Sequence, residues 1–449
     1  MRPTDLRHPV HTPFRLCTIV RMFVSSPASP PSPPSPPRAP AAPLRRARVA
    51  VAALFLTNGA LLANLLPRYP EIKAALGLAN STYGLALAAF PAGAILAGLA
   101  AAGLIRRLGS ARLAVLGTAL TALGLLLAAW APSAALLGLA LLVAGGCDAI
   151  TDVAQNAHGL RVQKRYGRTI INSFHAVWSV GAVIGGSMAA AAIALGIPLR
   201  WHLLGSGILF AIVALVALRF ALPGHDEEDH LPDPAAGDVA VGPDASTGGR
   251  TRGRLPLMLA ALVLIAIGGT LVEDSGNSWA TLYLSRDLGA ASSIAAIGYI
   301  ALVGAQFVGR LLADGLVDRL GQRAVARGGG AIIALGMGTA LAVPTVPGTI
   351  AGFALAGLGS ASLVPAAMQQ ADDLPGLRPG TGLTVVSWLM RLGFLASPPL
   401  VGLVADSAGL RTGLLVVPLA GLLVVLLAGV LPPRRAAHPE RERELSAAG

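Results

Sequence analysis

The sequence predicts an all-α membrane protein of twelve transmembrane helices, and three observations support this. Only 12% of the 449 residues are charged while 54% are hydrophobic, against roughly 25% charged in an ordinary soluble domain. Apolar runs of roughly 18 residues or more recur along the chain, each long enough to cross a hydrocarbon core of about 30 Å. The runs also lack the strict alternation of barrel strands, and helices satisfy their backbone groups internally in lipid.

The chain begins with a segment that has little apolar surface to bury. Residues 1–47 include the stretch 25–43, which is dominated by Pro, Ser and Ala. This composition predicts a disordered tail. The tail lacks the continuous apolar core of a signal peptide, so we expect it in the cytoplasm. Residues 432–449 are expected to form a second cytoplasmic tail.

The apolar runs fall into two groups of six, which predict two six-helix bundles. The first bundle, residues 48–221, is expected to have helices at roughly 48–66, 81–105, 112–131, 134–158, 169–195 and 201–221. The second bundle, residues 255–431, is expected to have them at roughly 255–283, 290–313, 324–344, 347–370, 381–405 and 410–431. Between the bundles, residues 222–254 carry seven acidic residues with interspersed Pro and Gly. That composition is incompatible with lipid and predicts a cytoplasmic linker.

The basic residues of the loops predict the orientation of the chain. One set of alternate loops and tails holds sixteen Lys and Arg residues: Arg45, Arg46, Arg48, Arg106, Arg107, Arg112, Arg161, Lys164, Arg165, Arg168, Arg319, Arg323, Arg327, Arg378, Arg434 and Arg435. The other set holds five: Arg68, Lys73, Arg200, Arg286 and Arg411. Because cytoplasmic loops carry the excess of basic residues, both termini are predicted to be cytoplasmic.

Several function classes are disfavoured by the composition. The net charge of +12 is scattered over short loops instead of forming one stripe, which argues against nucleic-acid binding. Cys17 and Cys147 are the only cysteines, so no disulfide framework or metal site is indicated. No nucleophile–base cluster, His-Glu-x-x-His motif or phosphate-binding loop is found. We therefore expect neither an enzyme nor an ATP-driven pump, and no cofactor.

The two bundles carry related loops. Arg107-Leu108-Gly109 after the second helix recurs as Arg319-Leu320-Gly321 after the eighth, and duplicated halves are typical of many transporters. At these loops the chain resembles the major facilitator superfamily, whose signature combines Gly, Asp, Arg, Gly and Arg. The second copy contains Gly309, Arg310, Asp314, Asp318, Arg319, Gly321 and Arg323. The first copy has Arg106 where an acidic residue is expected.

A second resemblance indicates a particular branch of this superfamily. The segments Asp152 to Gly159, Arg165 to Arg168 and Ser173 to Ser179 resemble bacterial inner-membrane transporters of the YbjJ type, near the fucose-permease-like branch. This resemblance implies a monomer in the plasma membrane whose two bundles rock about a central cavity. It implies secondary transport of a small polar solute such as a sugar or another metabolite, with protons as a possible coupling ion. A multidrug or metabolite exporter, and an uncoupled facilitator or exchanger, remain alternatives.

Ionisable and amide side chains inside the apolar runs are candidate site residues, because each is costly in lipid unless it binds or pairs. The fourth helix carries Asp148, Asp152, Gln155 and Asn156 on one face. The fifth helix carries Asn172, His175 and Trp178 at three-residue steps, which makes His175 a candidate partner for an aspartate. These groups either contact the solute or form a polar packing network. Asn58, Asn64, Gln369 and Gln370 likewise bind solute or join helices.

The second bundle supplies further candidates. Glu273, Asp274 and Asn277 lie in the seventh helix. Residue 273 is about 27 Å from the start of that helix at residue 255, so we expect Glu273 toward the periplasmic half of the membrane. Glu273, Asp274 and Asp152 are therefore candidate proton-coupling groups. For Glu273 and Asp274 the alternative is a fixed salt bridge or an exposed helix end. Arg391 is expected near the middle of the membrane, either paired with a carboxylate or holding an anionic solute. Gln306, Arg310 and Asp314 share a face of the eighth helix, and a gating role is expected for Arg310 and Asp314.

Overall fold

The computed structural model describes residues 42–166, 170–224, 249–375, 377 and 381–433. Twelve helices in this part of the chain are long and apolar enough to span a membrane, which confirms the predicted fold class. The predicted tails fall almost wholly outside the described residues, and so does most of the linker.

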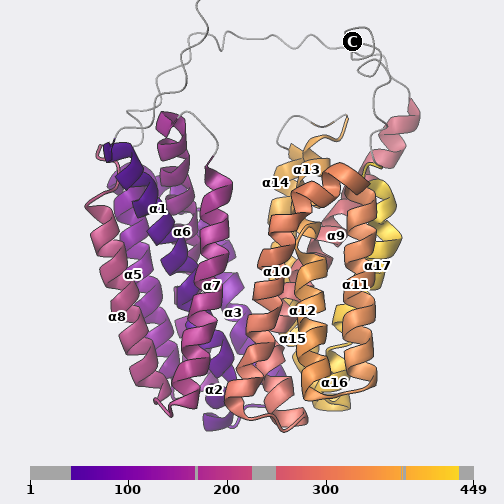
Figure 1. Cartoon of the computed structure of the whole chain (residues 1–449), viewed down its shortest axis with the longest axis horizontal. Helices are drawn as coiled ribbons and strands as arrows, with labels where there is room; N and C mark the ends of the chain where they lie inside the picture. The colour runs from indigo at the N-terminus through magenta and orange to yellow at the C-terminus, as the bar shows by residue number, and fades with distance from the viewer. Residues whose placement is uncertain (1–41, 167–169, 225–248, 376, 378–380, 434–449) are drawn as a thin grey trace, which may run out of the picture. The chain divides into compact units, whose positions relative to one another are not determined.

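The helices form two groups of six spans (Figure 1). The N-terminal half contains α1 (Ala42–Leu65) with η2 (Leu66–Arg68) and α2 (Tyr69–Ala75), α3 (Asn80–Gly98) with α4 (Ala101–Leu108), α5 (Ser110–Ala129), α6 (Ala134–Tyr166), α7 (Ile171–Ala194) and α8 (Leu199–Leu218). The C-terminal half contains α9 (Gly249–Leu282) with η4 (Tyr283–Asp287), α10 (Ser292–Leu320), α11 (Gln322–Ala342), α12 (Val346–Ser360) with α13 (Leu363–Asp372), α14 (Thr381–Leu389) with α15 (Arg391–Ala408), and α16 (Leu410–Gly413) with α17 (Val416–Leu427) and η5 (Ala428–Val430).

Four helices extend at least six residues further than their apolar runs predict. The first begins at Ala42 instead of residue 48, and α9 begins at Gly249 instead of residue 255. At their other ends, α6 continues to Tyr166 instead of residue 158 and α10 to Leu320 instead of residue 313. The apolar run marks only the part of a helix that lies in lipid, whereas the backbone can remain helical beyond it. Hydropathy therefore located the spans but underestimated these helix ends.

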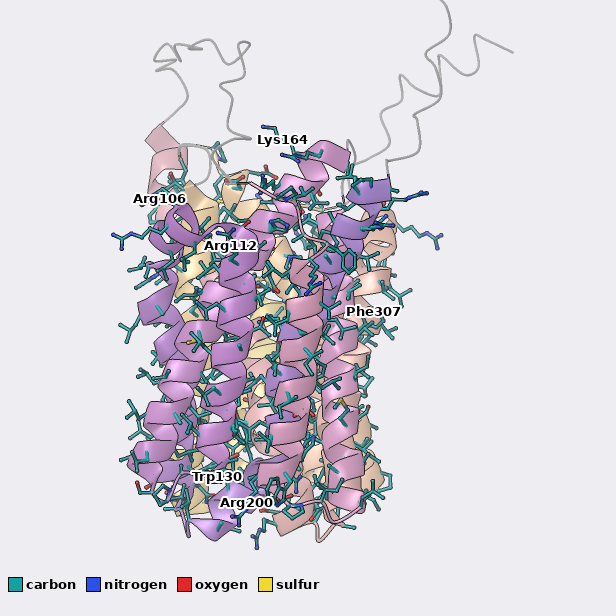
Figure 2. All side chains as sticks on the ribbon, turned by 90° about the vertical axis from the view of Figure 1, so that its left-hand side faces the viewer. Arg106, Arg112, Trp130, Lys164, Arg200 and Phe307 are labelled. Carbon is teal, nitrogen blue, oxygen red and sulfur yellow. The ribbon has the colours of Figure 1, made fainter. Side chains whose placement is uncertain are left out.

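Two ends of the spans must be distinguished. We call the end at which α1 begins, α8 ends and α9 begins the linker side, and the other end, which carries α2, η4 and α16, the opposite side. Figure 2 shows Arg106, Arg112 and Lys164 at the linker side of the N-terminal half, with Trp130 and Arg200 at the opposite side. Trp130 stacks on the Arg200 guanidinium at 5.9 Å, as expected for an amphipathic aromatic residue at a membrane–water interface.

The repeated Arg-Leu-Gly sequence forms the same turn twice. Gly109 separates α4 from α5 with φ 81° and ψ 148°, and Gly321 separates α10 from α11 with φ 85° and ψ 154°. In each case the glycine N–H donates to the carbonyl four residues earlier, that of Ile105 or Val317. This backbone conformation is essentially restricted to glycine, so the sequence repeat is also a structural repeat.

The two halves meet mainly along two helix pairs, α3 with α15 and α7 with α10. Small residues allow the close approach that helices in lipid need. A Cβ on Gly84 of α3 would clash with the Pro398 carbonyl of α15, and one on Gly402 of α15 would clash with the Asn80 carbonyl. On α7, a Cβ at Gly186 would meet the Tyr299 ring of α10 at 2.7 Å. These crossings bring the halves into direct contact toward the opposite side.

Candidate functional site

A polar cluster joins three helices of the N-terminal half around Asn58 of α1. Asn58 Nδ2 donates to Asp148 Oδ1 at 2.8 Å, and Asn58 Oδ1 accepts from Trp178 Nε1 at 2.8 Å. Gln155 Nε2 lies 3.4 Å from Asn58 Oδ1 and 3.3 Å from Asp152 Oδ1. We call Asn58, Asp148, Asp152, Gln155, Asn156 and Trp178 the Asn58 cluster. It connects α1, α6 and α7 at one place.

The members of the Asn58 cluster differ in how many of their polar atoms form hydrogen bonds. Asn58 is 6% exposed and both polar atoms of its amide are bonded, so it serves mainly to join the helices. Asn156 donates to the carbonyl and the carboxylate of Asp152, at 2.9 and 3.1 Å. The buried Gln155 Oε1 has no partner among the described residues. A buried acceptor of this kind is costly unless something donates to it.

His175 does not form the pair with an aspartate that its position in the sequence suggested. Within the described residues it makes no direct hydrogen bond or ion pair with a carboxylate, although Asp152 lies within its electrostatic range. Its ring instead packs edge-on against Phe55 at 5.2 Å, beside the stacked Phe55–Phe174 pair. The side chain is exposed. It is therefore available to a solute.

A second cluster crosses between the halves and is centred on Glu273 of α9. Gln306 Nε2 of α10 donates to Glu273 Oε2 at 2.8 Å, and Arg310 Nη2 lies 3.8 Å from the same oxygen. Arg310 Nη1 also reaches Ser179 Oγ of α7, in the other half, at 3.3 Å. We call Glu273, Gln306, Arg310 and Ser179 the Glu273 cluster. The partner of the helix-seven carboxylate is thus Arg310, not Arg391.

The depth of Glu273 also differs from the prediction. Its partner Gln306 is the fifteenth of the 29 residues of α10, which places this contact near the middle of that helix. Counting from residue 255 overestimated the depth because the α9 span covers 33 residues, whereas about 20 suffice to cross the hydrocarbon core. Asp274 lies 3.4 and 3.5 Å from Ser278 Oγ and also interacts with the Ser397 hydroxyl of α15. The buried Asn277 Oδ1 has no partner among the described residues.

Arg391 begins α15, directly after the interruption at Met390. The Met390 carbonyl accepts from Thr270 Oγ1 of α9 at 3.0 Å, which stabilises the broken span. Arg391 is half-buried and within electrostatic range of Asp152 in the other half. In the described part of the chain it forms no direct hydrogen bond or ion pair. The guanidinium therefore lies close enough to attract Asp152 of the Asn58 cluster without contacting it.

Asn64 lies near the end of α1 at the opposite side, where its Oδ1 is 2.8 Å from His202 Nε2 of α8, so it joins two helices of the same half. The other predicted residues described here lie nearer the linker side. Gln369 is exposed and accepts from Gln322 Nε2 of α11 at 2.7 Å, so it joins two helices of the same half. Arg107, Asp318 and Arg319 of the repeated loops are exposed. Arg323 donates to the Leu431 carbonyl at 2.9 Å. Gly309 is a packing contact, because a Cβ there would lie 2.6 Å from that of Ala361.

A contact that the sequence did not predict joins the halves at the opposite side. The Asp406 carboxylate at the end of α15 accepts the backbone N–H groups of Asn80 and Ser81, both at 2.8 Å, at the start of α3. We call this contact the Asp406 cap. Deeper in the same interface, Tyr83 OH donates to the Ser278 carbonyl at 2.9 Å and its ring packs edge-on against Trp279 at 5.0 Å.

Comparison with known proteins identifies relatives that cover most of the chain. Residues 50–314 and 258–448 match the sequence model of the family described as Major Facilitator Superfamily. The chain is 31% identical over 373 residues to the uncharacterized transporter y4wD of Sinorhizobium fredii, covering 82% of this chain and 94% of that protein. It is 29% identical over 392 residues to membrane protein MosC of Rhizobium meliloti, covering 87% and 91% of the two chains.

The fold also matches solved structures. One is a bacterial homologue of the human lysosomal transporter Spinster, in an inward-facing and unoccupied conformation. The TM-score is 0.67 at 14% identity, over 87% of this chain and 98% of that one. At this identity the match supports the fold alone.

Proposed function

Because the chain belongs to the major facilitator superfamily, and is thus a membrane transporter, we propose that it moves a small polar solute by alternating access, coupled to protons. The observation that carries this proposal is the Glu273 cluster. Arg310 is shared by Glu273 in its own half and Ser179 in the other half. A charge shared across the interface between two moving halves can make their movement depend on protonation.

The solute is proposed to bind between the Asn58 cluster and Arg391. The half-buried Asp152 and Asn156, the exposed His175 and the half-buried Arg391 offer acceptors, donors and charge to a polar molecule. The partnerless oxygens of Gln155 and Asn277 add acceptors for hydroxyl or amine donors. Arg391 has no direct partner in the described residues, which favours a role as a clamp for an anionic group of the solute.

The conformation supports a cycle in which access alternates between the two sides. The Asp406 cap and the Tyr83 contacts join the halves toward the opposite side. At the linker side, Arg323 and Gln369 form hydrogen bonds within their own half. We propose that this is the state open to the linker side, and that the linker side is cytoplasmic, as the excess of basic residues in its loops predicts.

Proton coupling is proposed to act through the carboxylate of Glu273. When it is ionised, Glu273 attracts Arg310 and accepts from Gln306. Protonation would remove the charge that holds Arg310, free the guanidinium and weaken the contact with Ser179. Only a group whose surroundings change between the two states can carry a proton through the cycle. Asp274 and Asp152 are alternative carriers.

The test is transport in liposomes containing purified protein, with a panel of polar solutes and with or without an imposed pH gradient. Wild-type protein should accumulate its solute only with the gradient. Glu273→Gln should abolish this accumulation yet spare solute exchange at equal pH, because exchange does not require the proton to be released. Asp287→Asn, which removes an exposed carboxylate at the opposite side, is the matched control. Wild-type accumulation that ignores the gradient would refute coupling and leave a facilitator or exchanger.

A further inference from the structure

A basic cavity lies at the linker end of the N-terminal half, outside both polar clusters. It has a volume of about 430 Å³ and is formed by the start of α5, by α6 and by the end of α8 with the residues that follow it. Three arginines line it, Arg112, Arg161 and Arg219, and none of its described lining residues is acidic. Small-molecule sites have volumes of roughly 300–1,000 Å³, so the cavity is large enough for a headgroup.

The three arginines are held in different ways. Arg161 is 7% exposed, and its terminal nitrogens donate to the carbonyls of Pro223 at 2.8 Å and Gly224 at 3.0 Å. Arg112 and Arg219 are exposed, and within the described part of the chain neither side chain forms a hydrogen bond or ion pair. The cavity therefore combines one fixed, buried cation with two that are available. The start of the 20-residue helix α5 adds the positive end of its dipole.

Below the cavity, α5 and α8 present apolar side chains to the lipid. On α5 the exposed residues Leu116, Leu120, Leu123 and Leu127 recur at helical spacing, with Arg112 one turn before them and Trp130 after them. On α8 the exposed residues Ile208, Ile212 and Leu215 form a similar stripe, which ends with Arg219 one turn later and has Trp201 at its other end. Both available arginines thus continue a lipid-facing stripe.

The length of α5 sets the depth of the cavity in the membrane. Its 20 residues rise about 30 Å, which equals the typical thickness of the hydrocarbon core. Trp130 and Arg200 mark the interface at the opposite side (Figure 2). Arg112, at the other end of the same helix (Figure 2), therefore lies at the headgroup level of the leaflet on the linker side.

We propose that this cavity binds the phosphate-bearing headgroup of an anionic phospholipid, whose acyl chains lie along the stripes of α5 and α8. Guanidinium groups bind phosphate oxygens through paired hydrogen bonds, and basic pockets between transmembrane helices suit such headgroups. A free phosphate would use the arginines but not the apolar stripes. The continuity of the cavity with both stripes therefore favours the lipid.

The experiment uses the full-length protein in nanodiscs that contain phosphatidylglycerol with a photoreactive group in one acyl chain. Illumination should label peptides of α5 and α8. Arg112→Gln/Arg219→Gln should reduce this labelling about tenfold or more, because it removes both available cations. Arg45→Gln/Arg46→Gln removes the same charge from exposed residues of α1 and should leave the labelling within about twofold of wild type. The corresponding phosphatidylcholine probe should label α5 and α8 weakly in all three proteins.

Three outcomes would overturn the proposal. The first is equal labelling of wild type and Arg112→Gln/Arg219→Gln, provided that this double variant and the Arg45→Gln/Arg46→Gln control both elute from a sizing column in detergent as folded wild-type protein does. The second is loss of labelling in millimolar inorganic phosphate, which would assign the cavity to free phosphate. The third is labelling that appears only after Asp226, Glu227, Glu228 and Asp229 are changed to their amides, which would assign the cavity to the acidic segment of the chain itself.

Discussion

The Asp406 cap predicts a measurable bias in the conformational equilibrium. Asp406 accepts two backbone N–H groups of α3, from Asn80 and Ser81 at 2.8 Å each, across the interface between the halves. Separation of the halves at the opposite side must break both bonds, whereas hydrogen bonds within each half can persist. The cap therefore stabilises the state that is closed at this side relative to the state that is open there.

The size of the effect follows from the type of contact. Replacing a side chain that caps a helix N-terminus with alanine costs typically about 1 kcal/mol and up to about 2, and the exposure of Asp406 to water argues against a larger value. Asp406→Ala should therefore shift the closed-to-open ratio by about 5- to 30-fold. Asp406→Asn keeps an acceptor and loses the charge, so its shift should be smaller.

Spin labels provide the assay. Cysteines introduced at the exposed positions Leu195 and Val343, at the ends of α7 and α11 on the opposite side, report the distance between the halves by pulsed electron resonance after Cys17 and Cys147 are replaced. Asp406→Ala should increase the long-distance population. Asp287→Asn, an exposed carboxylate of the same side, should not. Unchanged populations in Asp406→Ala would refute the assigned role of the cap.

Three further changes test the packing and the proposed site. Gly84→Val should increase the same long-distance population because its side chain would meet the Pro398 carbonyl, whereas at Gly98, where nothing lies within 4 Å, valine should have no effect. Asn58→Ala removes hydrogen bonds that join three helices, each worth roughly 0.6 kcal/mol in membranes. It should therefore lower the melting temperature in detergent more than Asn156→Ala does. An equal fall in the two variants would contradict the role of Asn58. Arg391→Gln should abolish transport in liposomes, and rescue by Asp152→Asn would show an internal electrostatic pair instead of a solute clamp.

Hydropathy predicted the membrane spans because it distinguishes segments surrounded by lipid from segments surrounded by water. The helices do lie where the apolar runs are. The pairing of charges could not be obtained in this way. Whether Glu273 meets Arg310 or Arg391 depends on the rotation and depth of three helices, and the distance between the residues in the sequence does not encode either. Asp406 was overlooked for a related reason, because its partners are backbone N–H groups, which every residue except proline carries.

The polar residues of the sequence indicated which helices form the polar clusters better than they indicated which partner each side chain has. Asp148 and Gln155, expected on one face of the fourth helix, both bond to Asn58 of α1. Among the described residues His175 makes no direct contact with an aspartate; it attracts Asp152 only at longer range, and its ring packs against Phe55. A histidine on a polar helix face has several favourable partners of similar energy, and only the packing of the neighbouring helix selects one of them.

The turns at Gly109 and Gly321 have a consequence for how the halves move. Each turn joins two helices through a single residue, so the joined ends of α4 and α5, and those of α10 and α11, cannot move far apart. Away from these turns, α10 and α11 both pack on α12 rather than mainly on each other. We therefore expect any change of angle between the joined helices to be small at the linker side and larger at their far ends.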